Sequence, residues 1–266
     1  MNRFRLVVFD LDGTLYRGAE PVPHAVPAVI RLRDEGVLVR YATNNSAATR
    51  EGTADKLCAM GYPAAPAEVY GSSHAAAALM GERGLWSAFV VGEPGCIGNL
   101  RASDVSVINA PEGRATPESD DVADAVVVGI CRTFTYTLLD SALQQLLLGA
   151  ELVATNRDAT YPLEAGRLQP GAGSLVAAIE AASGKPAQVA GKPERWMMDA
   201  ILRDAGVRPE QTLVVGDRED TDIVFGKRNG CATAMVLTGV GTRETAADYV
   251  LSDLSELFGS AMDAPR

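Results

Sequence analysis

The segment Arg5–Thr14, RLVVFDLDGT, is a run of bulky apolar residues that ends in two carboxylates. Its apolar part, Leu6–Phe9, is continuous rather than alternating, which is typical of a strand covered by helices on both faces. Asp10 and Asp12 follow at a spacing of two, so their side chains point the same way in an extended chain, and Gly13 permits a tight turn after them. The reactive crevice of an open α/β sheet lies at the carboxyl ends of its strands, so this pair could flank one reacting centre. A solvated turn explains two such acids equally well.

Similar apolar runs recur along the chain, with helical patterns between them. Tyr136–Leu148 places its leucines on one face of a helix, and Gly149 stands where such a helix would end. This alternation predicts an α/β fold, a Rossmann-like, doubly wound parallel sheet with helices on both sides. The expected strands are Arg5–Phe9, Val37–Ala42, Val126–Ile130, Glu151–Ala154, Gln188–Ala190, Thr212–Val215 and Thr233–Leu237.

Three later strands also end in residues that could do chemistry. Thr43–Ser46, TNNS, offers a hydroxyl and backbone N–H groups where a helix is expected to begin, which favours an anion. An ordinary helix cap by Asn45 or Ser46 is the plainer interpretation. Lys192 places one cation after its strand, where a lysine is usually just solvated. Asp217–Asp222, DREDTD, adds carboxylates, although an acidic helix start would explain these too.

Each of these segments has an ordinary explanation when it is taken alone, but four strands ending this way by accident would be uncommon. The carboxyl ends of parallel strands share one edge of the sheet. We therefore expect Asp10, Thr43, Lys192 and Asp217 to converge around a single divalent ion.

Composition excludes several classes of function. The chain has 266 residues, with 24 Lys+Arg against 34 Asp+Glu, and this charge of −10 argues against nucleic acid or an anionic membrane as main partner. The four cysteines lie far apart without a CxxC pair, which favours reduced thiols over a disulfide scaffold or a zinc site. No apolar stretch is long enough to span a membrane, and the first one lacks a signal-peptide cleavage site, so we expect a cytoplasmic protein.

The four strand ends, taken in order, resemble the four motifs of the haloacid dehalogenase superfamily. They are DLDGT (Asp10–Thr14), ATNNS (Ala42–Ser46), GKP (Gly191–Pro193) and GDREDTD (Gly216–Asp222). The TNN triplet and the long interval before GKP are similar to the branch with a class IIA cap, which contains the 4-nitrophenylphosphatase and N-acetylglucosamine-operon phosphatases. Leu152–Asp158, LVATNRD, is also similar to that branch.

The spacing of the motifs predicts a second domain. Asp10 and Thr43 are 33 residues apart, and Lys192 and Asp217 are 25 apart, which is about one strand–helix unit in each case. Thr43 and Lys192 are 149 residues apart, far more than a single crossover needs. The resemblance implies that the extra residues form an α/β cap domain, 81–186, inserted into a core domain of 1–80 and 187–266 and closing over the site.

The resemblance implies a Mg²⁺-dependent phosphatase. Asp10 would attack phosphorus to form an aspartyl-phosphate, and Asp12 would protonate the leaving oxygen and then activate water. Two unit charges about 4 Å apart repel by roughly 4 kcal/mol at an effective dielectric near 20, so a metal is needed, and an all-oxygen acidic site suits Mg²⁺. The ligands would be the Asp10 side chain, the Asp12 backbone carbonyl and Asp217, with Asp222 an outer-shell partner that orients metal waters or Lys192.

The same resemblance implies how the substrate is held. Thr43 and the Asn44 N–H would bind the phosphoryl oxygens beside Asn45, and Lys192 would neutralise the charge shared by the phosphate and Asp10. The substrate would be a small phosphorylated metabolite, a sugar phosphate or similar, with 4-nitrophenyl phosphate as an artificial one. The cap would determine which substrate is accepted. Asn156 and Asp158 are two candidates for contact with the leaving group, although a plain turn before Pro162 explains both equally well. The cap candidates are Asn156, Asp158 and Tyr161.

Two alternatives stay open beside hydrolysis. A phosphomutase would use the same residues and yield an isomerised sugar phosphate instead of free phosphate. A non-catalytic phospho-ligand binding protein on the same fold predicts loss of Asp10, Asp12 or Asp217, all of which are present. The resemblance also leaves a homodimer open, because caps of this size mediate dimers in some members.

Overall fold

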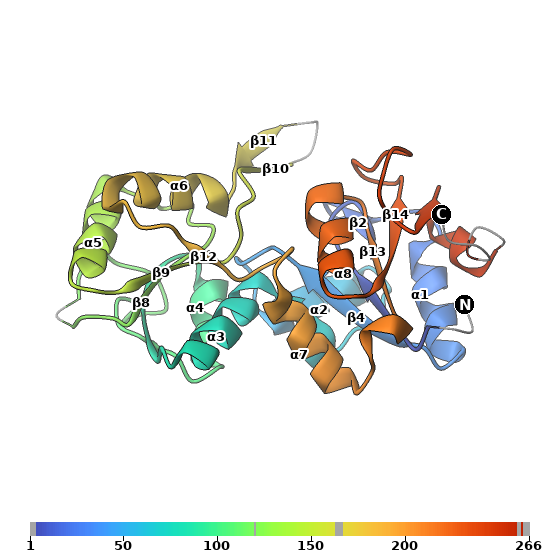
Figure 1. The fold of residues 1–266 in the computed structure, drawn as a ribbon, viewed down its shortest axis with the longest axis horizontal. Helices are drawn as coiled ribbons and strands as arrows, with labels where there is room; N and C mark the ends of the chain where they lie inside the picture. The colour runs from blue at the N-terminus through green and yellow to red at the C-terminus, as the bar shows by residue number, and fades with distance from the viewer. Residues whose placement is uncertain (1–3, 120, 163–166, 260–261, 263–266) are drawn as a thin grey trace. The chain divides into compact units, whose positions relative to one another are not determined.

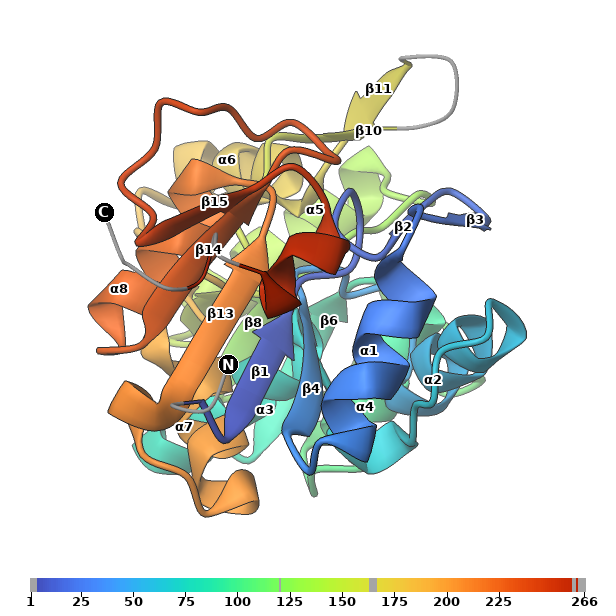
Figure 2. The same cartoon turned by 90° about the vertical axis from the view of Figure 1, so that its right-hand side faces the viewer.

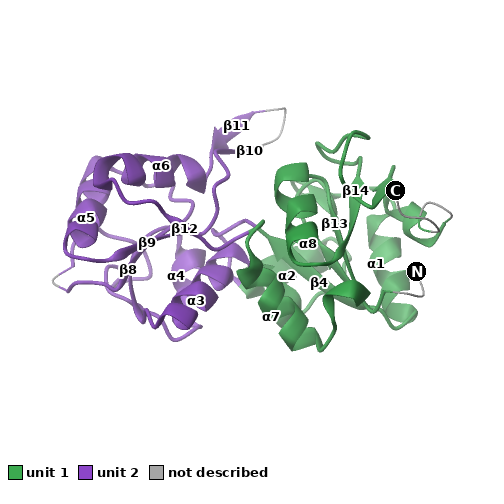
Figure 3. Ribbon diagram, in the orientation of Figure 1, with its two compact units in different colours: residues 1–43, 50–70, 192–266 green, residues 44–49, 71–191 purple. Residues whose placement is uncertain are grey.

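The structure, a computed structural model, describes residues 4–119, 121–162, 167–259 and 262. The chain forms two compact units, shown in Figure 3. Unit 1 comprises residues 1–43, 50–70 and 192–266, and unit 2 comprises 44–49 and 71–191. The chain therefore passes between the units four times, and two of these passages fall inside the TNNS and GKP segments.

Unit 1 is built on a six-stranded sheet in the order β15-β14-β13-β1-β4-β5. All pairs from β15 to β4 are parallel, and the register places Phe9 of β1 between Val215 of β13 and Tyr41 of β4. The strands are β1 (Leu6–Phe9), β4 (Leu38–Thr43), β5 (Val69–Gly71), β13 (Thr212–Gly216), β14 (Ala232–Val236) and β15 (Tyr249–Leu251). A two-stranded hairpin, β2 (Tyr16–Arg17) and β3 (Glu20–Pro21), follows β1.

Helices cover both faces of the unit 1 sheet, as the continuous apolar strands require. Val7 and Phe9 pack in one cluster with Val29 and Leu57, so α1, α2 and η5 cover that face. Val214 points the other way, toward Gly226 of α8. Figure 2 shows α1 in front of the sheet and α7 behind it. The helices are α1 (Ala25–Asp34), α2 (Arg50–Ala59), α7 (Arg195–Ala205) and α8 (Val224–Arg228), with short turns η1 (Pro66–Glu68), η3 (Pro209–Gln211), η4 (Glu219–Ile223) and η5 (Leu254–Phe258).

Unit 2 has its own parallel sheet and its own core. Phe89 and Val126 pack against α5 and α6 on one face, and Figure 1 shows α3 and α4 on the other side of this sheet. The strands, in the order β12-β9-β8-β6-β7, are β12 (Gln188–Val189), β9 (Glu151–Ala154), β8 (Ala125–Val128), β6 (Ser87–Val91) and β7 (Ser106–Val107). The remaining elements are α3 (Ser72–Arg83), α4 (Pro94–Arg101), α5 (Tyr136–Leu147), α6 (Ala172–Ser183) and the antiparallel pair β10 (Thr160–Pro162) and β11 (Leu168–Pro170).

The α/β fold with parallel sheets and flanking helices is confirmed, and each expected strand lies within two residues of an observed one. The strand β6 was not expected, although Ala88–Val91 is as apolar and as buried as the other strands. The short strands β5 and β15 have three residues each and carry too little pattern to be recognised. Within the described parts of the chain, every helix is too short or too polar to cross a membrane.

Candidate active site

Asp10 and Asp217 are brought together by the register of the unit 1 sheet. The Asp10 N–H donates to the Val215 carbonyl at 2.9 Å, so the pairing of β1 with β13 continues to the first carboxylate. Asp217 follows the last residue of β13, and Asp222 lies in the next turn, η4. Oxygens of these three carboxylates all lie within 4.8 Å of one another. The carboxylates of Asp10 and Asp217 therefore converge in unit 1, as the sequence predicts, and Asp222 joins them.

Lys192 lies inside this cluster. Its side chain is only 3% exposed, and its ammonium donates to Asp10 Oδ1 and Asp222 Oδ1 at 2.6 Å each and to the Ala42 carbonyl at 3.1 Å. Burial alone would lower the pKa of Lys192, but the two carboxylates outweigh it and raise that pKa. The lysine is therefore a permanent buried cation, held in place by Asp222 as well as by Asp10.

The cluster has an excess of negative charge. Three carboxyl groups face one ammonium, so their full ionisation would leave a net charge of −2. Burial and the charge of Asp222 raise the pKa of Asp10 well above its usual range, although Lys192 opposes the shift. Burial and Asp222 likewise raise the pKa of Asp217 to about 6. A divalent cation would neutralise this excess.

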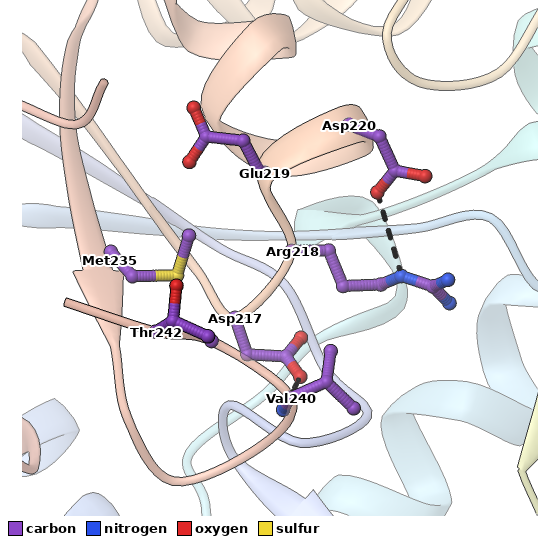
Figure 4. A pocket seen from close by; sticks show the side chains of 8 residues that line it. Asp217, Arg218, Glu219, Asp220, Met235, Val240 and Thr242 are labelled. Atoms are coloured by element: carbon purple, nitrogen blue, oxygen red, sulfur yellow. Dashed lines mark hydrogen bonds and ion pairs between the residues drawn. The ribbon is translucent and has the colours of Figure 1, made fainter. Parts of the chain in front are cut away.

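One oxygen of Asp217 is the clearest sign of a cation site. Figure 4 shows the Asp217 carboxylate beside Val240, whose backbone N–H donates to Oδ2 at 2.8 Å. The other oxygen, Oδ1, is buried and has no hydrogen-bond partner among the residues that the structure describes. A buried acceptor without a partner costs free energy, and carboxylate oxygens are the ligands that hard divalent cations prefer. The residues present therefore fit a divalent metal ion.

Asp12 lies at the exposed rim of the same site. The Tyr16 hydroxyl donates to Asp12 Oδ2 over a long 3.5 Å, and the Lys56 ammonium lies 3.8 Å from the centre of the Tyr16 ring. Partial loss of solvent around the carboxylate raises the pKa of Asp12, while Lys56 and Lys192 oppose the shift. A raised pKa suits a carboxyl group that first gives up a proton and then accepts one.

Thr43 ends β4 and is buried at the same edge of the unit 1 sheet. The expectation that a helix begins directly after it was wrong, because residues 44–49 form a loop and α2 begins only at Arg50. Ser46 does not cap a helix: its hydroxyl is buried in unit 2 and accepts from the Ile130 N–H at 3.0 Å. The residues of the expected anion site therefore lie in a loop held by long-range contacts and not at a helix start.

In unit 2, Asn44 contacts two of the three cap candidates, Asn156 and Asp158. Its carbonyl accepts from the Asn156 side-chain amide and from the Ser72 hydroxyl, at 2.7 Å each. Asn156 is buried, and its Oδ1 accepts from the Asp158 N–H at 3.0 Å, which is a local Asx turn. The Asn44 side-chain amide also approaches Asp158 Oδ2 at 3.4 Å, and Asn45 Oδ1 accepts from the Ala47 N–H.

Tyr161, the third cap candidate, lies in β10, and its hydroxyl contacts Arg132 and Gln169. Its hydroxyl accepts from the Arg132 guanidinium at 3.1 and 3.2 Å and donates to Gln169 Oε1. Arg132 in turn pairs with Glu93 at 3.5 Å. The contact of Tyr161 with a leaving group stays a prediction.

Sequence reasoning missed three contributors to these contacts. Tyr16 and Ser72 carry no motif signal, since an aromatic residue after a turn and a serine at a helix start are both common. The backbone N–H of Val240 carries none at all, because every residue except proline has one.

Comparisons with known proteins bear on the same residues. A model described as haloacid dehalogenase-like hydrolase matches residues 7–106, and a HAD-hydrolase-like model matches 189–257. The chain is 37% identical to glycerol-3-phosphate phosphatase from Gallus gallus, over 97% of this chain and 87% of that one. It is 36% identical to chronophin from Homo sapiens, over 97% of this chain and 89% of that one.

Solved structures agree with these sequence relatives. The p-nitrophenyl phosphatase from Archaeoglobus fulgidus superposes with a TM-score of 0.85 at 29% identity, covering 96% of this chain and 98% of that one. A glycerol phosphate phosphatase from Mycobacterium tuberculosis in complex with magnesium superposes with a TM-score of 0.87 at 32% identity, covering 99% of this chain and 79% of that one.

Proposed function

This chain belongs to the haloacid dehalogenase-like hydrolases and is a phosphatase, and we propose that it hydrolyses small phosphate monoesters with Mg²⁺ through a phosphorylated Asp10. The observation that carries the proposal is the buried cluster of Asp10, Asp217 and Asp222 around Lys192. Its charge excess and the unpartnered oxygen of Asp217 favour a divalent cation of the hard, oxygen-preferring kind.

Asp10 is the proposed nucleophile. Lys192 holds its Oδ1 at 2.6 Å, whereas among the described residues Oδ2 accepts only a long 3.5 Å hydrogen bond, from Thr14, so Oδ2 is the oxygen better placed to attack. As Oδ2 bonds to phosphorus, the bond to the ester oxygen breaks and Asp12 gives its proton to the leaving alkoxide. Asp12 then takes a proton from water, which attacks the aspartyl-phosphate and releases inorganic phosphate.

The remaining roles follow from charge and position. The side chains of Asp10 and Asp217 and the Asp12 carbonyl would hold Mg²⁺, which would supply positive charge beside the phosphoryl group. Thr43 and the backbone N–H groups of Asn44 and Asn45 would bind phosphoryl oxygens.

The substrate class is a small phosphorylated metabolite. Glycerol 3-phosphate is the first substrate to test, because glycerol phosphate phosphatases occur both among the sequence relatives and among the solved structures. Sugar phosphates and other small monoesters belong in the same panel.

We also propose that the two units serve as core and cap, with the core at about residues 1–80 and 187–266 and the cap at 81–186. The division into unit 1 and unit 2 supports this assignment, with α3 grouped in unit 2. In the proposal, unit 1 provides the chemistry and unit 2 selects the leaving group, with Asn156, Asp158 and Tyr161 as the candidates.

The test is release of phosphate from 4-nitrophenyl phosphate and from the metabolite panel. We expect activity that needs Mg²⁺, that EDTA abolishes and that Asp10→Asn removes, while the exposed control Asp55→Asn on α2 keeps it. Undiminished turnover by Asp10→Asn would exclude the nucleophile. An isomerised sugar phosphate without free phosphate would indicate a mutase instead.

A further inference from the structure

The segment Thr238–Gly241, which follows β14, lies directly against the Asp217 carboxylate. Its contact is the hydrogen bond from the Val240 N–H to Asp217 Oδ2. The Val240 side chain takes no part, since the residue is 66% exposed. A backbone group therefore holds one oxygen of the most clearly unsatisfied carboxylate in the site.

Two glycines make this close approach possible. A Cβ added to Gly239 would overlap Asp217 Oδ2 and lie 2.5 Å from Cγ, closer than real side chains approach. In the turn after β1, a Cβ added to Gly13 would lie 2.5 Å from the same oxygen, and Gly13 also has a φ of +87°. The Asp217 carboxylate is thus enclosed by two residues that have no side chain.

Hydrogen bonds hold the segment at its start and hold the chain a few residues after its end. Before Gly239, the Thr238 hydroxyl donates to the Gly13 carbonyl at 2.8 Å, and the Arg17 guanidinium donates to the Thr238 carbonyl. Further along, the Glu219 carboxylate accepts from the Thr245 hydroxyl and from the Ala246 N–H. These contacts restrict the path of the backbone that carries the Val240 N–H.

Packing alone would not fix the orientation of Asp217. A cavity of about 190 Å³ lies beside it, lined in part by Glu219, Met235 and Thr242 (Figure 4). The carboxylate therefore has space on that side, and the hydrogen bond from Val240 selects one orientation. With Oδ2 held, Oδ1 is left as the buried oxygen without a partner in the described structure.

We infer that Thr238–Gly241 is a positioning element, which holds Asp217 Oδ2 so that Oδ1 is presented to a divalent cation. Hydrogen bonds to metal-binding side chains from outside the coordination sphere orient them and commonly change metal affinity about 10- to 100-fold. The inference rests on the proposed function, because Asp217 must be a metal ligand for its orientation to matter.

The test measures Mg²⁺ affinity by titration calorimetry without substrate, on the full chain. Gly239→Ala displaces the Asp217 carboxylate, and Val240→Pro removes the N–H, so we expect each to weaken Mg²⁺ binding about 10-fold or more. Val240→Ala is the matched control, since it keeps the N–H and truncates an exposed side chain, and should bind Mg²⁺ as the parent does. In the activity assay, the half-saturating Mg²⁺ concentration should rise while kcat recovers at high Mg²⁺.

A milder variant covers the case in which Gly239→Ala or Val240→Pro does not fold. Thr238→Val removes only the hydroxyl bond to Gly13, and it should weaken Mg²⁺ binding in the same direction. Folded variants that all bind Mg²⁺ with the parent's affinity would overturn the positioning role while leaving the proposed function intact. A parent protein that binds no divalent cation would instead overturn the proposed function.

Discussion

Lys192 shows most directly how one residue makes the site possible. Burying an ammonium group costs several kcal/mol unless it is paired, and here two carboxylates and a carbonyl accept its hydrogen bonds. In return, Lys192 allows Asp10 and Asp222 to stay close together in a buried place. In the proposed mechanism, the substrate phosphate therefore approaches an Asp10 carboxylate whose charge Lys192 already partly compensates.

Replacing Lys192 tests this charge balance. Lys192→Met keeps most of the length of the side chain but removes the cation, and we expect kcat for phosphate release to fall about 100- to 1,000-fold. The free energy of unfolding of the metal-free protein at neutral pH should fall by about 3–5 kcal/mol, because buried carboxylates lose their partner. Lys227→Met is the control: Lys227 pairs with Asp248 at the surface and should cost about 1 kcal/mol or less in urea unfolding.

For Asn156, a positioning role can be distinguished from direct contact with the substrate. Both of its side-chain polar atoms are used inside unit 2, which favours a role in positioning the Asn44–Asn45 peptide over direct contact with substrate. We expect Asn156→Ala to cost about 1–3 kcal/mol of unfolding free energy and to raise KM for the phosphate ester. Ser72→Ala, which removes the other donor to the Asn44 carbonyl, should act in the same direction. Lower stability with an unchanged KM would mean that Asn156 is only structural.

At the scale of elements, Asp248 connects three neighbours of the unit 1 sheet. Lying just before β15, it accepts from the Thr233 N–H and hydroxyl of β14, at 2.8 and 2.9 Å, and from Lys227 of α8 at 2.9 Å. Burial would raise the pKa of Asp248, but the hydrogen bonds from Lys227 and Thr233 outweigh it and lower the pKa. The edge of the sheet is therefore held by an ionised carboxylate.

This lowered pKa predicts a pH dependence of stability. A carboxyl group whose pKa is lower in the folded than in the unfolded state stabilises the fold above its unfolded pKa, near 4, and the benefit disappears as the pH falls through the folded value. We expect Asp248→Asn to be less stable than the parent by about 1–2 kcal/mol at pH 7 and nearly equal to it at low acidic pH. A difference in unfolding free energy that stays constant from pH 7 down through this range would contradict the assignment.

At the scale of the whole molecule, the two units differ in what they contain. The converging carboxylates and Lys192 all belong to unit 1, while unit 2 has a separate parallel sheet with its own apolar cluster. Mg²⁺ should therefore stabilise unit 1 directly, by about 2.7 kcal/mol at a concentration a hundred times its dissociation constant.

Hydrogen exchange can locate this stabilisation. We expect Mg²⁺ to slow amide exchange in β1 and β13 of unit 1, whose ends carry Asp10 and Asp217, and to leave β6 and β8 of unit 2 nearly unchanged. Asp217→Asn, which changes a proposed metal ligand, should abolish the effect. Equal slowing in both units would show that they open together.

Much of this protein could be read from local patterns. Continuous apolar runs predicted the strands, and the residues directly after β1 and β13 identified Asp10 and Asp217, because neighbouring parallel strands deliver their carboxyl ends to one edge of a sheet. Lys192 was expected at that edge for the same reason, but its strand β12 lies in the unit 2 sheet, so the shared edge does not explain its position. The hydrophobic pattern of a strand and the residue types at its end depend only on residues close together in the sequence, so they can be recognised without knowledge of the fold.

Other features depend on residues far apart in the chain, and no local pattern reports them. The sequence suggests that Ser46 caps a helix, but its hydroxyl accepts from the distant Ile130 N–H. No local pattern indicates that the Asn156 amide donates to the Asn44 carbonyl. The Val240 N–H is a group that almost every residue possesses, and only its placement against Asp217 makes it informative. The sequence therefore determines which chemical groups the site contains. The tertiary structure determines how a carboxylate such as Asp217 is oriented, because the backbone group that holds it comes from a segment distant in the sequence.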